Sequence, residues 1–236
     1  MLYLTILTAL AHKPSFGDSY ISEESAYPVS DPNISIVVYQ ELTCENPELW
    51  LAFDAPDDFE LYVQLGVPVV EWLDGYQPTV AVVAEGLPAA DTLPFSIPDG
   101  MGAVIYEAAD TPDTFYEPFT QTESWVWVEE RLQVSGKGYI VGWHPADFTG
   151  KIWLATGEVE DFSDVEIADF IYWTEAVNNF HETGRFAFPE PQEVQSCSPL
   201  EEEGKPASCA AISSSDWSLL TFCGGLLGLS LRRRRS

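Results

Sequence analysis

The three histidines of this chain, His12, His144 and His181, are the residues whose types and spacing suggest metal chemistry. His12 follows the segment Ala9–Ala11, a small-x-small pattern after which signal peptidases cut. Cleavage there would leave an N-terminal histidine, whose α-amine and ring nitrogen can chelate one metal ion. With His181 or His144 as the second imidazole, the site would suit Cu(II), which stands near the top of the affinity order for divalent first-row metals.

This ligand set resembles the histidine brace of lytic polysaccharide monooxygenases and of some periplasmic copper carriers, which are also β-sandwiches. The resemblance implies a copper cofactor and either an oxidative reaction or copper transport. An ordinary alternative stays open for both partner histidines. His144 lies in the turn GWHPADF, and His181 lies at the end of a predicted helix, where the helix dipole favours a histidine.

Motifs of other enzyme classes do not occur in the sequence, which has no G-x-S-x-G elbow, no HExxH and no P-loop. With 38 Asp and Glu residues, abundance singles out no carboxylate pair for glycoside hydrolysis. We therefore predict no catalytic residue. The aromatic segments FYEPF (115–119) and SWVWV (124–128) could form a sugar-stacking platform, but we expect them in the core, where such residues more often lie.

The charge of the chain is strongly negative, with 38 acidic and 10 basic residues and a formal net charge of −28. Such a surface repels phosphate backbones, so nucleic acid is not an expected partner. The stretches Asp54–Glu60 and Gly157–Glu166 could bind calcium, which takes carboxylate oxygens, but neither has the D-x-[DN]-x-[DN]-G loop. The alternative is a solvated acidic coat, as in proteins from salty habitats.

Both ends of the chain predict export and anchoring. Residues 1–11 are mostly apolar and shorter than the roughly 20 residues of a membrane span, which indicates a cleaved signal peptide. They lack the usual leading positive charges, which favours a start codon further upstream. The apolar run Trp217–Leu231 contains three glycines and precedes Arg232–Arg235, which would stay on the cytoplasmic side.

Cys209, the apolar run and the four arginines together resemble the MYXO-CTERM sorting signals of myxobacteria and their relatives. The resemblance implies processing near Cys209 and attachment of an exported protein to the cell surface, with the membrane or envelope as its partner. A simple tail anchor is the alternative. The predicted organisation is a signal peptide (1–11), an ectodomain (12–187), an acidic Pro/Ser linker (188–208) and a sorting segment (209–236).

The ectodomain has the pattern of an antiparallel, jelly-roll-like β-sandwich. LWLAF (49–53) and FELYVQL (59–65) alternate with period two, as half-buried strands do. Residues 85–123 are predicted as a long ordered loop around one strand, 103–108. Five further strands, separated by Pro, Gly and Asp turns, complete two layers: 35–42, 79–84, 124–134, 138–143 and 151–159.

One C-terminal α-helix is expected near 164–182. Ser163 and Glu166 have the spacing of a capping box at its start. Its apolar positions recur at helical spacing, and Gly184 can end it. The predicted apolar positions are Ile167, Phe170, Ile171, Thr174, Val177 and Phe180.

Two stretches resemble hairpins of the bacterial pre-peptidase C-terminal β-sandwich domains: GKGYIVGWHPADFTGKIWLATGE (136–158) and ELWLAFDAPDDFELYVQL (48–65). The resemblance implies a sandwich appended to exported proteins, without an active site of its own. The long loop and the helix depart from that family.

The four cysteines lack the spacing of a zinc site. Cys209 and Cys223 belong to the tail, which leaves Cys44 and Cys197 as a pair that a disulfide could join in an oxidising compartment. The sequence thus favours an exported, surface-anchored protein acting as a non-enzymatic binding or structural module of the envelope. The alternative is a copper protein that uses His12.

Overall fold

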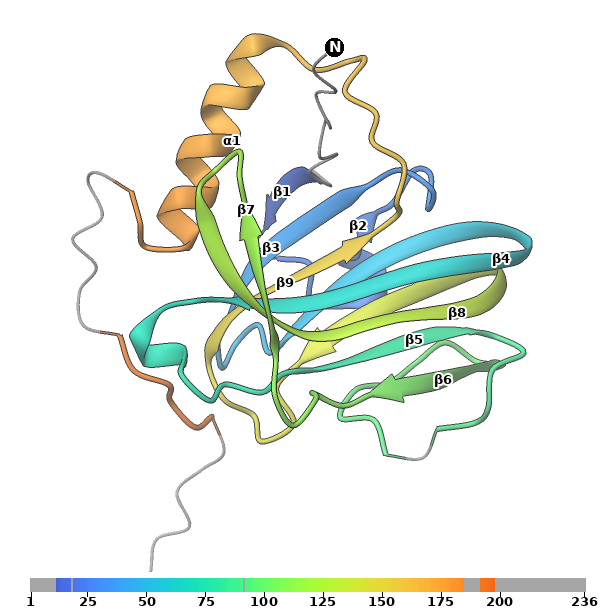
Figure 1. Ribbon diagram of the computed structural model, residues 1–236. Helices are drawn as coiled ribbons and strands as arrows, with labels where there is room; N and C mark the ends of the chain where they lie inside the picture. Colours follow the sequence, from blue (N-terminus) through green and yellow to red (C-terminus); the bar gives the residue numbers. More distant parts are fainter. Residues whose placement is uncertain (1–11, 18, 91, 185–191, 198–236) are drawn as a thin grey trace, which may run out of the picture. The chain divides into compact units, whose positions relative to one another are not determined.

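The computed structural model describes residues 12–17, 19–90, 92–184 and 192–197 (Figure 1). The predicted signal peptide, the sorting segment with Cys209 and most of the linker lie outside these residues. No helix within the described residues is long and apolar enough to cross a membrane. The elements are β1 (Lys13–Gly17), η1 (Glu23–Ser25), β2 (Tyr27–Pro28), β3 (Ile36–Leu42), β4 (Glu48–Pro68), η2 (Glu71–Leu73), β5 (Thr79–Glu85), β6 (Met101–Tyr106), β7 (Asp113–Glu117), β8 (Thr122–Trp143), β9 (Gly150–Thr156) and α1 (Ile167–Phe180).

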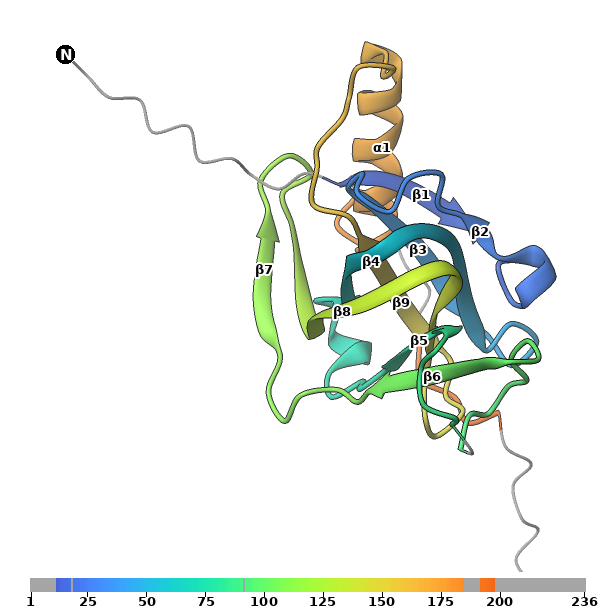
Figure 2. The ribbon, with the colours of Figure 1, turned by 90° about the vertical axis from the view of Figure 1, so that its right-hand side faces the viewer.

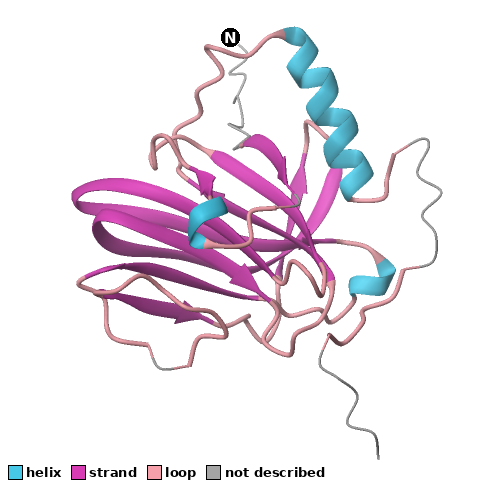
Figure 3. Ribbon diagram, turned by 180° about the vertical axis from the view of Figure 1, so that it is seen from behind, coloured by secondary structure: helices cyan, strands magenta, loops and turns pink. Residues whose placement is uncertain are grey.

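The predicted all-β fold with one helix is confirmed (Figure 3). The strands form one hydrogen-bonded sheet in the order β1-β3-β9-β4-β8-β5-β6, with β2 added beside β4 and β7 beside β8. The sheet is mixed and not wholly antiparallel as predicted, because β1 pairs with β3 and β2 with β4 in parallel. A parallel pair needs a crossover connection of a dozen or more residues, and the chain between β1 and β3 provides one.

Two long strands, β4 and β8, fold this single sheet into two layers. They pair antiparallel along most of their length, with a register shift between Ala55 and Phe59. At this bulge Asp58 and Gly136 have positive φ, which Asp and Gly adopt more readily than other residues. The pair formed by β4 and β8 bends strongly as it crosses the sheet (Figures 1 and 2). Beyond the bend, β4 pairs with β9 as well as β8.

The first layer consists of β2, the first half of β4, the second half of β8, β5 and β6. The second layer consists of β1, β3, β9, the second half of β4, the first half of β8 and β7. The main core cluster includes residues of both layers, such as Leu51, Val82, Leu65 and Leu154. Burial of these apolar side chains between the layers is the main favourable contribution to folding.

Several predicted strands lie where they were expected, but the strands with which they were expected to pair are wrong. The segments 49–53 and 59–65 are one bent strand and not a hairpin, since both halves pair with β8. The predicted pair 138–143 and 151–159 is also not a hairpin, because β8 and β9 have different partners in that region. Residues 85–123 contain a second strand, β7, in addition to the expected β6. Alternation shows that a segment is a strand, but not which strand it joins.

The helix begins later than predicted, at Ile167. Its N-cap is Glu166, whose backbone N–H donates to the carboxylate of Asp169 at 2.9 Å, so Ser163 is not the capping residue. Ile167 and Ile171, predicted on the buried face, are 82% and 66% exposed. The predicted positions Phe170, Val177 and Phe180 do face the sheet, and Trp173 replaces the two isoleucines on this face, which also lines the site described below.

Candidate functional site

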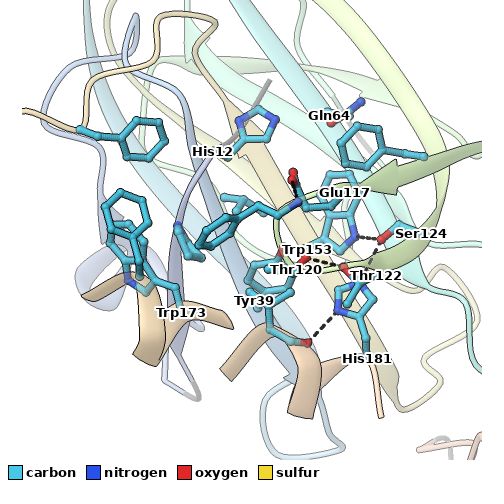
Figure 4. Close-up of a pocket in the computed structure, with 17 residues that line it drawn as sticks. His12, Tyr39, Gln64, Glu117, Thr120, Thr122, Ser124, Trp153, Trp173 and His181 are labelled. Carbon is cyan, nitrogen blue, oxygen red and sulfur yellow. Dashed lines mark hydrogen bonds between the residues drawn. The ribbon is translucent and has the colours of Figure 1, made fainter. Parts of the chain in front are cut away.

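A cavity lies between α1, β7 and the outer face of the second layer (Figure 4). Its free volume is about 130 Å³. We call it the aromatic cavity, because seven of its lining residues have aromatic rings other than imidazole. It is lined by His12, Pro14, Val37, Tyr39, Gln64, Phe115, Glu117, Phe119, Thr120, Thr122, Ser124, Trp153, Phe162, Phe170, Trp173, Val177 and His181.

Local periodicity explains why these side chains share one space. Phe170, Trp173 and Val177 follow one another at spacings of three and four residues, which places them on one face of a helix. On β3 and β7, lining residues alternate, as in Phe115 and Glu117, because strand side chains point to opposite faces in turn. The cavity is therefore the space left between an apolar helix face and a sheet face that carries both apolar and polar side chains.

Aromatic rings on the helix side stand at steep angles to each other. The Phe170 ring lies 5.6 Å from Phe119 and 5.5 Å from Trp173, at interplanar angles of 71° and 77°. Phe162, from the segment before the helix, lies 5.8 Å from Phe170. The edge-to-face pairs of Phe170 with Phe119 and Trp173 are favourable and hold the rings in place, whereas Phe162 is tilted at 44° to Phe170. The result is a wall of defined shape.

A chain of hydrogen bonds forms the polar end of the cavity (Figure 4). The indole N–H of Trp153 donates to Ser124 Oγ at 3.1 Å, and Ser124 Oγ lies 3.1 Å from His181 Nε2. His181 Nδ1 lies 2.9 Å from the carbonyl oxygen of Val177. Because a carbonyl only accepts, Nδ1 carries the hydrogen, and Nε2 accepts from the serine hydroxyl. Burial lowers the pKa of His181 to about 4, so the imidazole is neutral at pH 7.

This serine–histidine–carbonyl arrangement has the form of a nucleophile, a base and an orienting group. It also satisfies every hydrogen-bonding atom of a buried imidazole, which a protein core requires in any case. Ser124 Oγ already accepts the indole N–H and donates to the imidazole. The arrangement fixes Trp153 and the end of α1 against each other.

Glu117 is the single carboxylate among the lining residues. One of its oxygens, Oε1, accepts a hydrogen bond from the backbone N–H of Phe119 at 2.9 Å. Burial raises the pKa of the Glu117 carboxyl above its usual value. The pKa of Tyr39 is raised mainly by burial and, as a second cause, by the negative charge of Glu117, which indicates that the two groups are close. Negative charge is thus held beside aromatic rings.

The structure brings His12 and His181 to the same cavity, but at different ends of it. His12 Nδ1 lies 2.5 Å from Ser35 Oγ, whereas the His181 ring lies 5.9 Å from the ring of Tyr39. Ser35 and Tyr39 are four residues apart in extended chain, which corresponds to about 13 Å. Both ring nitrogens of His181 are engaged in the bonds given above.

His144 lies elsewhere, with its ring 4.5 Å from Tyr76 and 4.9 Å from Phe148. Its Nδ1 accepts the backbone N–H of Ala146. Burial lowers the pKa values of His12 and His144 to about 4, as it does for His181. Over the described residues, no group of three or more His, Cys, Asp or Glu side chains is placed to hold a metal ion.

The remaining predicted residues fall into two groups. Cys44 and Cys197 are joined by a disulfide in the structure, with their Cα atoms 5.1 Å apart. Cys209 lies outside the described residues. Of the two acidic stretches, Asp54–Glu60 presents exposed carboxylates, and in Gly157–Glu166 the side chains of Glu158 and Asp164 pair with Arg131 and Lys13.

Most of the lining residues were missed at the level of sequence. FYEPF is not part of the core as expected, because Tyr116 and Phe119 are 50% and 47% exposed. It contributes Phe115, Glu117 and Phe119 to the cavity wall. One signal was present, since Thr120, Thr122 and Ser124 alternate with period two and all three line the cavity. The chain matches none of the protein-family models and none of the curated proteins with which it was compared.

Proposed function

We propose that this protein is an exported, surface-anchored binding module of the cell envelope, and that it takes its ligand into the aromatic cavity. The observation that carries the proposal is the cavity itself, with about 130 Å³ of free volume, ring walls and a polar end. An engineered apolar cavity of about 150 Å³ binds benzene or xenon, so this volume suits a small molecule. Pockets that bind small molecules combine apolar walls with a few placed polar groups in the same way.

Filling the cavity tests this proposal. The variant Val177→Phe places a larger side chain on the cavity face of α1, while Ile171→Phe adds similar bulk at a position of the same helix that is 66% exposed. A library of small molecules would be screened against the full chain by intrinsic tryptophan fluorescence, to which Trp153 and Trp173 contribute among the eight tryptophans of the chain. We expect ligands whose binding is lost in V177F and kept in I171F; ligands unaffected by V177F would place binding elsewhere.

Export and anchoring rest on the sequences of the two ends and are tested separately. Mass spectrometry of the protein recovered from the cell surface would fix both mature termini. We expect His12 as the first residue and processing near Cys209. Recovery of the chain from the cytosol with Met1 and Arg232–Arg235 still present would refute this part of the proposal.

A copper site that uses His12 is the second candidate, and it would require His12 and His181 to move together, since they border the same cavity at different ends of it. A site based on His12 would need its Nδ1 released from Ser35, and His181 would have to give up one of its two present partners. Copper titration of the mature protein tests it, with a variant that carries one extra residue before His12 as the control. Equal copper affinity of the two forms would exclude a site that uses the terminal amine.

A further inference from the structure

The aromatic cavity has one charged side chain in its lining, and the ammonium of Lys151 near His181 is paired with Glu182. Its lining contains one carboxylate, that of Glu117, and no Lys or Arg. The two lining histidines are engaged in hydrogen bonds: His181 Nδ1 donates to the Val177 carbonyl and its Nε2 accepts from Ser124, as in a neutral imidazole, and His12 Nδ1 lies against Ser35 Oγ. A positively charged group in this space would therefore meet no like charge among the lining side chains.

The walls are also of the kind that attract cations. The face of an aromatic ring carries partial negative charge, and a cation within about 6 Å of the ring centre is stabilised, most strongly by Trp. Trp153 and Trp173 line the cavity from the sheet side and the helix side, and Tyr39 lies near Glu117. The steep angles between Phe119, Phe170 and Trp173 are those of adjoining walls of a box.

We infer that the aromatic cavity binds a small organic cation of the quaternary ammonium class, held by the rings and by the carboxylate of Glu117. This inference rests on the proposed function and specifies its ligand. A quaternary ammonium group suits the site because it is charged but has no N–H to leave unpaired among the rings. An inorganic cation would lose its hydration shell here for a single carboxylate.

The charge of the whole chain acts in the same direction. A net charge of −28 raises the local concentration of cations and repels anions at low and moderate salt. Ligands with a carboxylate or a phosphate would in addition meet the Glu117 carboxylate without a compensating cation in the lining. Of the charged ligands of this size, cations are the class that the cavity favours.

Choline and its neutral isostere 3,3-dimethylbutan-1-ol test the inference, because they differ mainly in a charged nitrogen against a carbon. Both would be titrated into the full chain by calorimetry and by tryptophan fluorescence. We expect choline to bind about tenfold more tightly, as expected for cation–π attraction in a desolvated site. Equal affinities would overturn the cation inference but leave the cavity as a ligand site.

Two matched pairs of variants locate the interaction. Glu117→Gln should weaken choline about tenfold and leave the isostere unchanged, while Asp113→Asn, an exposed acid on the same strand, should leave both unchanged. Trp173→Leu should weaken choline, while Tyr172→Leu, whose ring is 60% exposed, should not. Circular dichroism of each variant would check that it is folded.

Failure of choline and failure of the proposed function are distinguishable. If neither choline nor the isostere binds the wild-type chain, the cation inference is refuted. The proposed function is then decided by the small-molecule screen with V177F and I171F, which does not depend on charge. If choline binds and W173L or E117Q retains full affinity, the cation is bound outside this cavity and the inference is also refuted.

Discussion

The two outer faces of the sandwich carry similar apolar surfaces and are covered in different ways. On the first layer, the segment around Phe95 crosses the face, and the Phe95 ring lies 4.9 Å from Trp50 and 5.2 Å from Trp143. These residues and their neighbours form one packed cluster. On the second layer the cover is α1, and the aromatic cavity lies beneath it. One face is filled, and the other keeps free space.

The difference follows from the shape of the two covers. A loop can follow a twisted sheet and place a side chain wherever there is room, whereas a straight helix contacts a sheet along a narrow stripe. The last turn of α1 is held by the Lys151–Glu182 ion pair and by His181, while Ile167 in its first turn is 82% exposed. Free space between a straight helix and a twisted sheet is therefore a consequence of the geometry of the two elements.

Removing the disulfide should have the largest effect on the helix-covered face. Cys44 and Cys197 are 153 residues apart, and the chain-entropy relation assigns about 5 kcal/mol to a loop of this length. Urea unfolding of the double variant Cys44→Ser, Cys197→Ser should show a loss of this order. Because residues 192–197 follow α1 in the chain, hydrogen exchange should rise more in α1 than around Phe95; an equal rise would contradict the comparison.

Breaking the ion pair at the end of α1 should have the next largest effect. Lys151 Nζ lies 2.7 Å from Glu182 Oε1, and the side chains are only 8% and 12% exposed. The ammonium also donates to the carbonyl oxygen of Phe180. Lys151→Met leaves a buried carboxylate without its cation and should cost about 4 kcal/mol in thermal or urea unfolding.

The exposed Lys137→Met is the control for this variant and should change stability by less than about 0.5 kcal/mol. Ligand binding in the cavity should weaken in K151M, because α1 loses its fixed end. If K151M kept full stability, the ion pair would not be what holds this cover in place.

The strands were predictable because their signals are local. Alternation in 49–53 and 59–65 and the apolar run 79–84 required no knowledge of partners, and all three are strands in the structure. The pairing was not predictable in the same way. The bend that turns β4 into parts of two layers depends on a three-residue bulge opposite Ser135, and that geometry is set by the partner strand.

The site was less predictable than the fold for a related reason. Ser124 and His181 are 57 residues apart, and their hydrogen bond exists only because α1 docks on the second layer. Helical spacing alone favoured Ile167 and Ile171 as buried residues, since it gives a periodicity but not the direction in which the helix faces. The hydroxyls of Thr120, Thr122 and Ser124 were the one local sign of a polar patch on this face.

Acid should destabilise the helix-covered face through His181. Its pKa is about 4 in the folded protein and 6.5 as the reference for the unfolded chain, so the unfolded state binds more protons between these values. Stability is then complete above about pH 6.5 and falls by about 3 kcal/mol on going down to pH 4. His181→Gln should remove this part of the pH dependence in urea unfolding measured from pH 7 to pH 4.

His144→Gln is the matched control for the pH measurement. Burial lowers its pKa in the same direction, but its ring lies between Tyr76 and Phe148, away from the cavity. H144Q should also flatten the pH profile while leaving ligand binding unchanged at every pH. If H181Q kept the full acid sensitivity of the wild type, protonation of this imidazole would not be the cause.

The smallest expected effect is the difference between removing one aromatic ring from the Phe95 segment and removing one from α1. Phe95→Ala removes a ring packed against Trp50 and Trp143 on the filled face and should cost about 3 kcal/mol, the lower end of the range for Phe in cores. Phe170→Ala removes a ring that contacts Phe119, Phe162 and Trp173 but has free space on its cavity side, where no partner atoms are lost, and we expect about 1 kcal/mol. Urea unfolding measures both.

The difference of about 2 kcal/mol in the free energy of unfolding between F95A and F170A measures how much more closely the Phe95 segment packs on the first layer than α1 packs on the second. Ligand binding should respond in the opposite sense, unchanged in F95A and weakened in F170A, since only Phe170 borders the cavity. If F170A destabilised the chain as much as F95A, the helix would be packed as tightly as the loop. The second face would then have no room for a ligand.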